Sequence, residues 1–381
     1  MGDTMNHIER IVASMTNAPV DRLTTLPLAS EVNRRLVGAT NREYCEDPKV
    51  RAAADIAGWK YFGYEAILGL TSLSIEAEDL GTDVWFPDEN TPQTRNPAIK
   101  NPEDYETLEV PEDKMFTTME GRMGQFAIGT RMIKERIGDG MGVAQGNTIV
   151  VPLVCGPLLQ LTQSTFAEQV FMDMYLHPNE VHKALKVTTE TATKHIAAQA
   201  ANGADTCVMD YLWANYSVLG DKEYNEFEGD KYGPVCNKAE EDNGILFGIH
   251  SCADLPNMDV QVKKWKPVYF SYCHYPNIVG SLTEAEVILN GYGDDTIMMG
   301  GLNPQMWVRA TPEQMREATI DILESVSAAL VTKGLNSRFS ICSGCEVPPA
   351  LSTNMANIQM MVDTVKNEGP KIMEKAGLPK P

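Results

Sequence analysis

Positive charge is scarce in this chain of 381 residues, which has 32 Lys and Arg against 52 Asp and Glu and a net charge of −20. Such a surface repels phosphate backbones and anionic lipids, so we expect neither a nucleic acid nor a membrane as a partner. No apolar segment approaches the roughly 18 residues that span a bilayer. The first residues also lack the basic start and apolar core of a secretory signal, and we expect a cytoplasmic protein.

Motifs of several common enzyme classes are also missing. No Gly-x-Gly-x-x-Gly follows a predicted strand, no phosphate-cradling Gly-Lys-Ser/Thr occurs, and there is no Gly-x-Ser-x-Gly of a hydrolase. The eight cysteines are too sparse for a disulfide scaffold. In a cytoplasmic protein they stay reduced, which makes them available as metal ligands.

Short apolar runs alternate with longer helical patterns along the whole chain. The predicted strands are Thr24–Leu28, Ala66–Ile75, Thr148–Val154, Asp205–Asp210, Ile245–His250, Val268–Cys273, Thr296–Gly300 and Arg338–Ile341. Near-continuous apolar strands separated by helices favour a parallel sheet covered on both faces. Eight such units predict a closed (α/β)8 TIM barrel. With no internal repeat and no convincing linker, residues 1–381 are predicted to form one domain.

Several local signals refine this prediction. Residues 1–20 read as an N-terminal helix, with Ile8, Ile11, Val12 and Met15 on one stripe. His177-Pro178 opens a helix that runs to about Ala201, and Thr311 before Pro312 is a helix N-cap. Residues 85–113, rich in proline, and residues 220–233 are predicted to be surface insertions, the first of them lid-like.

In a barrel, the chemistry takes place at the carboxyl ends of the strands. His250 and Cys252 are two residues apart in an extended strand end, so both can face one ion. Imidazole and thiolate suit Zn²⁺, and a third ligand would leave one position open. Cys345 is the best third ligand, because Gly344 and the following prolines fix its loop. Cys342 is the alternative, although we expect it inside the last strand, facing the core. Buried cysteines and histidines are also common without any metal.

Two carboxylates at strand ends are candidate catalytic groups. Asp210 closes an apolar strand and should face the barrel mouth. Glu78 could reach the open position of the metal or hold the N–H group of a ligand. Glu76 is two residues from Glu78 and would face the same side in an extended strand end, but a glutamate there is equally typical of a solvated helix start.

Aromatic side chains cluster near the same strand ends. We name Tyr211, Trp213 and Tyr272 as candidate substrate-binding residues, since with Tyr216 and Tyr275 they could form an apolar wall for a flat substrate. Packing within the core is the alternative role for each of them.

Together these motifs give the chain a family resemblance. Its marks, each weak alone but in a specific order, are Glu76-Ala77-Glu78-Asp79-Leu80-Gly81, Gly156-Pro157, His177-Pro178, Gly203-Ala204-Asp205, His250-Ser251-Cys252, Asn303-Pro304 and Gly344-Cys345. The chain resembles the uroporphyrinogen decarboxylase superfamily, and within it the zinc-dependent, corrinoid-linked methyltransferases. The resemblance implies zinc ligands at His250, Cys252 and Cys345, and cobalamin supplied by a corrinoid protein partner. A homodimer is compatible with it.

The resemblance leaves several functions open. Decarboxylases of this superfamily bind porphyrin carboxylates through a Met-Arg-Gln-Ala-Gly-Arg segment, which residues 26–35 lack. One methyltransferase role moves a methyl group from a methylated donor, such as a methoxylated aromatic, to cob(I)alamin. The opposite role moves it from methylcobalamin to a thiol such as coenzyme M. The two insertions and the aromatic strand ends favour O-demethylation. A catalytically silent barrel that only binds corrinoid is a further alternative.

Overall fold

The computed structural model describes residues 3–70, 72–138 and 148–381. Its centre is a sheet of eight parallel strands. These are β1 (Thr24–Leu26), β2 (Ile67–Gly69), β5 (Val150–Cys155), β6 (Thr206–Asp210), β7 (Leu246–Ser251), β8 (Tyr269–Tyr272), β9 (Ile297–Gly301) and β10 (Phe339–Cys342). A backbone hydrogen bond of 3.1 Å from Glu65 N–H to Thr25 O joins the two ends of the sheet, beside β1 and β2.

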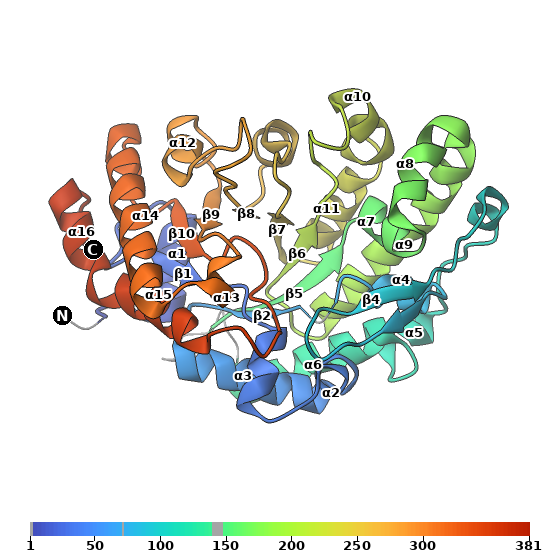
Figure 1. The fold of residues 1–381 in the computed structure, drawn as a ribbon, viewed down its shortest axis with the longest axis horizontal. Coiled ribbons are helices and arrows are strands. Elements are labelled where there is room, and N and C mark those ends of the chain that lie inside the picture. The colour runs from blue at the N-terminus through green and yellow to red at the C-terminus, as the bar shows by residue number, and fades with distance from the viewer. Residues whose placement is uncertain (1–2, 71, 139–147) are drawn as a thin grey trace.

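Helices surround these strands (Figure 1). The α-helices are α1 (His7–Met15), α2 (Asn41–Glu46), α3 (Pro48–Phe62), α4 (Ile75–Asp79), α5 (Asp113–Thr117), α6 (Arg122–Ile137), α7 (Pro157–Gln163), α8 (Ala167–Leu176), α9 (Pro178–Ala201), α10 (Asp221–Tyr224), α11 (Gly233–Asp242), α12 (Glu284–Leu289), α13 (Met306–Arg309), α14 (Pro312–Lys333), α15 (Met355–Asn367) and α16 (Gly369–Ala376). Two 3-10 helices are η1 (Glu31–Leu36) and η2 (Pro102–Glu106), and two π-helical segments are η3 (Asn225–Gly229) and η4 (Asp259–Lys264). No helix in the described ranges has both the length and the apolar character needed to cross a membrane.

The predicted barrel and its eight strands are confirmed, with one strand much shorter than expected. The predicted run Ala66–Ile75 contains only β2, and Ile75 instead begins α4. The Ser72 hydroxyl accepts a hydrogen bond of 2.9 Å from Ser74 N–H, and this local turn ends the extended chain. The helix Pro178–Ala201 and the N-cap at Thr311, whose side chain accepts from Gln314 N–H, are also as predicted.

The two predicted surface insertions are more embedded than expected. Residues 85–113 contain the second strand of the antiparallel hairpin β3 (Asp83–Trp85) and β4 (Gln93–Asn96), but Ile99 and Tyr105 within them are buried. Residues 220–233 include α10 and η3, where Tyr224, Phe227 and Glu228 are buried. Ile99, Tyr105, Tyr224 and Phe227 belong to one apolar cluster with residues of α7, α8 and α9.

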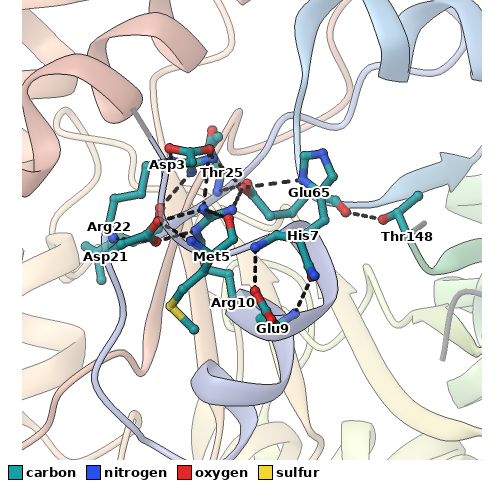
Figure 2. A network of polar contacts seen from close by, with 12 residues as sticks. Asp3, Met5, His7, Glu9, Arg10, Asp21, Arg22, Thr25, Glu65 and Thr148 are labelled. Carbon is teal, nitrogen blue, oxygen red and sulfur yellow. Dashed lines mark hydrogen bonds and ion pairs between the residues drawn. The ribbon is translucent and has the colours of Figure 1, made fainter. Parts of the chain in front are cut away.

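An ionic cluster joins α1 to the amino-terminal side of the barrel, and Figure 2 shows it. Arg10 and Arg22, both fully buried, lie 2.9 and 2.8 Å from the same carboxylate oxygen of Glu65. Asp21 pairs with Arg10 at 2.8 Å, and Asp3 pairs with Arg22 at 2.9 Å. The second Glu65 oxygen accepts the N–H of Thr25 in β1. The cluster therefore fastens the N-terminal helix to the first strand.

This cluster should make the fold sensitive to acid. Burial alone raises the pKa of Asp21, but hydrogen bonds from Arg10 and from backbone N–H groups outweigh it and lower the pKa to about 2. A carboxyl with a depressed folded-state pKa adds stability above its unfolded pKa, roughly 4, and loses it as the pH falls towards 2. We therefore expect the urea midpoint of Asp21→Asn to fall less than that of the wild type between about pH 4.5 and pH 2. If the urea midpoints of the two proteins fell by the same amount over this pH range, the result would contradict this role for Asp21.

Candidate metal centre

Three of the sequence-predicted ligands come together at the carboxyl end of the barrel. His250 lies in β7, Cys252 follows the end of that strand, and Cys345 follows β10. One ligand atom from each lies within 4.8 Å of the other two. No other group of three or more His, Cys, Asp or Glu side chains meets the same criterion in the described part of the chain.

The local structure explains how β7 presents two of these groups. His250 and Cys252 are separated by one residue at an extended strand end, so their side chains leave on the same face. The His250 Nδ1 atom lies 3.1 Å from the hydroxyl of Ser271 in the neighbouring strand β8. This contact orients the ring and makes Nε2 the nitrogen available to a metal ion. The Tyr275 hydroxyl donates to the Cys252 carbonyl oxygen at 2.9 Å and holds the chain after β7.

The loop after β10 is shaped to place Cys345. Gly344 has a φ of 76°, and a Cβ there would lie 2.8 Å from the Leu302 carbonyl oxygen, so only glycine fits without strain. The Ser343 hydroxyl donates to Cys345 O at 2.6 Å and accepts from Leu28 N–H at 2.8 Å. The loop is therefore tied to the chain that leaves β1.

The three side chains have the chemistry of a zinc site. Contact with Cys252 lowers the pKa of the Cys345 thiol well below its usual range, against the effect of burial, and His250 lowers it further. These contacts favour the thiolate of Cys345, the form that binds metals, whereas the contact with Cys345 raises the pKa of the Cys252 thiol, as burial also does. Two sulfur atoms and one imidazole nitrogen form a donor set that fits Zn²⁺ and leaves a fourth position open. Cys342 lies buried within β10, near Ser271, as expected for a core residue.

A cavity of about 470 Å³ adjoins these ligands. Its described lining is Leu28, Ser30, Glu31, Leu68, Leu70, Ser72, Leu73, Asn90, Thr91, Pro92, Gln93, Thr94, Leu153, Gln163, Val208, Asp210, His250, Cys252, Cys345, Glu346, Pro348 and Pro349. Residues 90–94 belong to the predicted lid-like segment. This volume holds a small molecule but not a corrinoid macrocycle, which would have to approach from outside.

Of the two predicted catalytic carboxylates, the structure brings only Asp210 into this cavity. It ends β6, is almost fully buried, and its Oδ1 atom has no hydrogen-bond partner among the described residues. Burial raises the pKa of Asp210 to about 6, although His250 acts in the opposite direction.

Glu78 is placed elsewhere, because residues 75–79 are helical rather than extended. It pairs with Arg122 at 2.9 Å and does not line the cavity. In a helix, positions two apart point to nearly opposite sides, so Glu76 turns inward instead. Glu76 is buried, with Oε1 2.8 Å from His195 Nδ1. The expectation that Glu78 reaches the metal is not supported by this geometry.

The predicted aromatic wall is also absent from the described lining of the cavity. Tyr211 follows Asp210 and therefore points to the other face of the sheet, where its hydroxyl donates to Asn237 at 2.9 Å. The Trp213 indole N–H donates to the Thr162 hydroxyl at 2.7 Å. Tyr272 follows the inward-facing Ser271, is fully buried and packs near Phe270. In this structure all three contact other parts of the protein, and mainly leucines and prolines form the apolar part of the cavity lining.

Three residues of this region were not singled out from the sequence: Ser271, Glu31 and Glu346. Ser271 touches His250, while Glu31 and Glu346 line the cavity from the chain after β1 and the loop after β10. A signal for Glu346 was available, since it directly follows Cys345. Nothing in the local pattern around Ser271 or Glu31 distinguishes them from ordinary strand-end residues.

The contact between Ser271 and His250 leads to a specific prediction. Replacing Ser271 by alanine removes the group that orients the imidazole, and losing such an outer partner costs about 10–100-fold in metal affinity or activity. We expect Ser271→Ala to bind zinc at least about tenfold more weakly in a competition with a chelating dye. Ser340→Ala, a buried serine of β10 outside the metal centre, is the matched control. Unchanged affinity in Ser271→Ala would mean that the hydroxyl does not orient the ligand.

An (α/β)8 barrel with a His-Cys-Cys cluster at its carboxyl end defines the class of this protein, and comparison with known proteins gives its family. The uroporphyrinogen decarboxylase (URO-D) family model matches residues 6–368, so the chain belongs to this family. A methylated-thiol–coenzyme M methyltransferase from Methanosarcina mazei is 22% identical over 306 residues, covering 76% of this chain and 79% of that protein.

Solved structures agree on the fold. A methyltransferase from Methanosarcina mazei superposes with a TM-score of 0.76 at 16% identity, covering 95% of this chain and 98% of the other. A B12-independent methionine synthase from Shewanella sp. W3-18-1 reaches a TM-score of 0.51 at 11% identity, covering 86% and 88%.

Proposed function

We propose that this chain is a zinc-dependent methyltransferase that passes a methyl group from a methylated donor to cob(I)alamin on a corrinoid protein. The donor in this proposal is a methoxylated aromatic, and the enzyme acts in the cytoplasm. The observation that carries the proposal is the convergence of His250, Cys252 and Cys345 beside a cavity of about 470 Å³. The methyltransferase relative supports the reaction class.

In this proposal the cavity holds the donor with its methyl group towards the mouth. Zinc bound by the three ligands would supply a Lewis acid that polarises the ether oxygen. The carbon–oxygen bond of the donor would break with its electron pair left on the oxygen, and the methyl group would pass to the corrinoid of the partner, whose cobalt(I) would supply the electron pair of the new bond. The buried Oδ1 of Asp210, which has no described partner, orients the donor from the side of β6.

Decarboxylation of a porphyrin is disfavoured by the same cavity. Binding several carboxylates needs cationic groups, and the described lining contains neither Arg nor Lys. Arg34 and Arg35 lie in the segment that corresponds to the arginine motif of the decarboxylases, but their side chains donate to backbone carbonyl groups instead, including those of Pro349 and Thr353.

The reverse reaction, from methylcobalamin to a thiol such as coenzyme M, is the second candidate. The name of the Methanosarcina mazei relative favours it. A panel of methoxyarenes, methylamines and thiols, assayed with free cob(I)alamin and with methylcobalamin, separates the two directions. We expect the absorbance of methylcobalamin to appear when enzyme, cob(I)alamin and a methoxyarene are mixed. If only thiols react, and they consume methylcobalamin, the second candidate is correct. A zinc-loaded protein that reacts in neither direction would point to a silent barrel.

A further inference from the structure

Besides Asp210, two acidic side chains line the cavity outside the metal cluster. Glu31 is the first residue of η1, and Glu346 directly follows Cys345. The Glu346 Oε1 atom accepts a hydrogen bond of 2.6 Å from the Ser30 hydroxyl and one of 3.2 Å from Glu31 N–H. These contacts hold the two carboxyl groups on the same wall of the cavity.

The carboxyl group of Glu31 is fully buried and unsatisfied. Neither of its oxygens accepts a hydrogen bond of normal geometry from the described residues, because the side chain of the neighbouring Asn41 donates to the carbonyl groups of Pro87 and Asn90. The nearby Arg34 guanidinium group instead donates to the backbone carbonyls of Ala39, Asp88 and Pro349. A buried carboxyl group without a partner is costly, and each such group calls for an explanation, such as a bound water, ion or ligand. Since Glu31 lines the cavity, a bound molecule can supply the missing hydrogen bonds.

The rest of the lining restricts what that molecule can be. Acidic groups stand on two sides, Glu31 and Glu346 on one and Asp210 on another, and no Arg or Lys lines the cavity among the described residues. A carboxylate or sulfonate placed beside Glu31 would have no Arg or Lys partner among the described lining residues, and in the proposed function the ether oxygen of the donor takes the open position of the zinc. The remaining walls are apolar, formed mainly by Leu28, Leu68, Leu70, Leu73 and Leu153 with three prolines. These apolar walls suit a flat, uncharged molecule.

We propose that Glu31 is the specificity-determining residue of the cavity, accepting the hydroxyl of an uncharged methoxyphenol and disfavouring anionic donors. This inference rests on the proposed function and deepens it by naming the donor subclass. A site that binds a substrate hydroxyl through a buried acceptor distinguishes strongly between substrates with and without that hydroxyl. A methylated substrate that lacks it leaves the buried acceptor unpaired.

The test compares two donors that differ in charge. Calorimetric titration of the zinc-loaded enzyme with 2-methoxyphenol and with 4-hydroxy-3-methoxybenzoate requires no cobalamin. We expect 2-methoxyphenol to bind at least about tenfold more tightly than the benzoate. Burying the carboxylate of the benzoate without a partner costs more than about 1.4 kcal/mol, which is a factor of ten in affinity. In Glu31→Gln this preference should shrink severalfold, while in Glu109→Gln, which removes an exposed carboxylate, it should not change.

Melting temperatures show whether a loss of binding in Glu31→Gln comes from unfolding of the variant. Removing an unsatisfied buried carboxyl should leave the melting temperature of Glu31→Gln equal to or above that of the wild type. Equal affinity for the two donors, no binding of either, or an unchanged preference in a folded Glu31→Gln would overturn the inference. If the preference holds but no methyl transfer occurs, the proposed function fails and this binding role of Glu31 stands. If only the benzoate is demethylated, the proposed function stands and the inference fails.

Discussion

Replacing Cys345 by alanine is expected to empty the metal centre and to lower the methyl-transfer rate by about 10³-fold or more. Lewis-acid stabilisation by a bound metal is worth several kcal/mol, and each 1.36 kcal/mol corresponds to about a factor of ten. With only His250 and Cys252 left, the donor set falls below the three protein ligands typical of catalytic zinc. Elemental analysis of the purified variant should find well under one zinc per chain, against one in the wild type.

The matched control is Cys342→Ala, which removes a thiol three residues earlier in the chain. Cys342 lies within β10 and is fully buried, so its loss should lower stability slightly and leave the zinc content intact. Cys345→Ala should keep the circular dichroism spectrum of the wild type because Cys345 is not part of the barrel core, and Cys342→Ala should keep it because losing one small core side chain does not unfold the barrel. Full zinc and activity in Cys345→Ala, together with their loss in Cys342→Ala, would transfer the ligand role to Cys342.

Replacing Glu65 by alanine should cost the fold about 3–5 kcal/mol, the usual effect of breaking a buried ion pair from one side. The change would leave Arg10 and Arg22, both fully buried, without the carboxylate that they share. It would also remove the acceptor for Thr25 N–H in β1. The urea midpoint of the variant should fall accordingly at neutral pH.

Glu106→Ala provides the comparison for this variant. Glu106 pairs with Lys183 at the surface, where both side chains are more than half exposed. Exposed pairs contribute between roughly 0 and 1 kcal/mol, so this variant should unfold close to the wild type. If Glu65→Ala were as stable as Glu106→Ala, the ionic cluster would not be what fastens α1 to the barrel.

The barrel could be predicted because its signals are local. Each strand is a short apolar run, and the helix that begins at Pro312 carries its own cap and first-turn proline. The pair His250 and Cys252 was also predictable, since residues two apart in a strand share a face. The same rule does not apply to Glu76 and Glu78, because residues 75–79 form a helix, in which positions two apart face nearly opposite sides.

The lining of the cavity was harder to predict. Asp210 and Tyr211 are adjacent in an extended segment, so they face opposite sides, and only Asp210 faces the cavity. Strand alternation alone could have excluded Tyr211. Glu31 and Glu346 are 315 residues apart and meet only because β1 pairs with β10. No local pattern carries that information.

The fate of the methyl group tests the central proposal most directly. The zinc-loaded enzyme would be mixed under reducing conditions with cob(I)alamin and 2-methoxyphenol carrying ¹³C in its methyl group, and followed by NMR. The proposal predicts that the ¹³C signal moves from the methoxy position to the cobalt-bound methyl in the wild type. In Cys345→Ala the signal should stay on the donor. A label that remains on the methoxyphenol with fully zinc-loaded wild-type enzyme, while methylcobalamin loses its methyl group to a thiol, would contradict it.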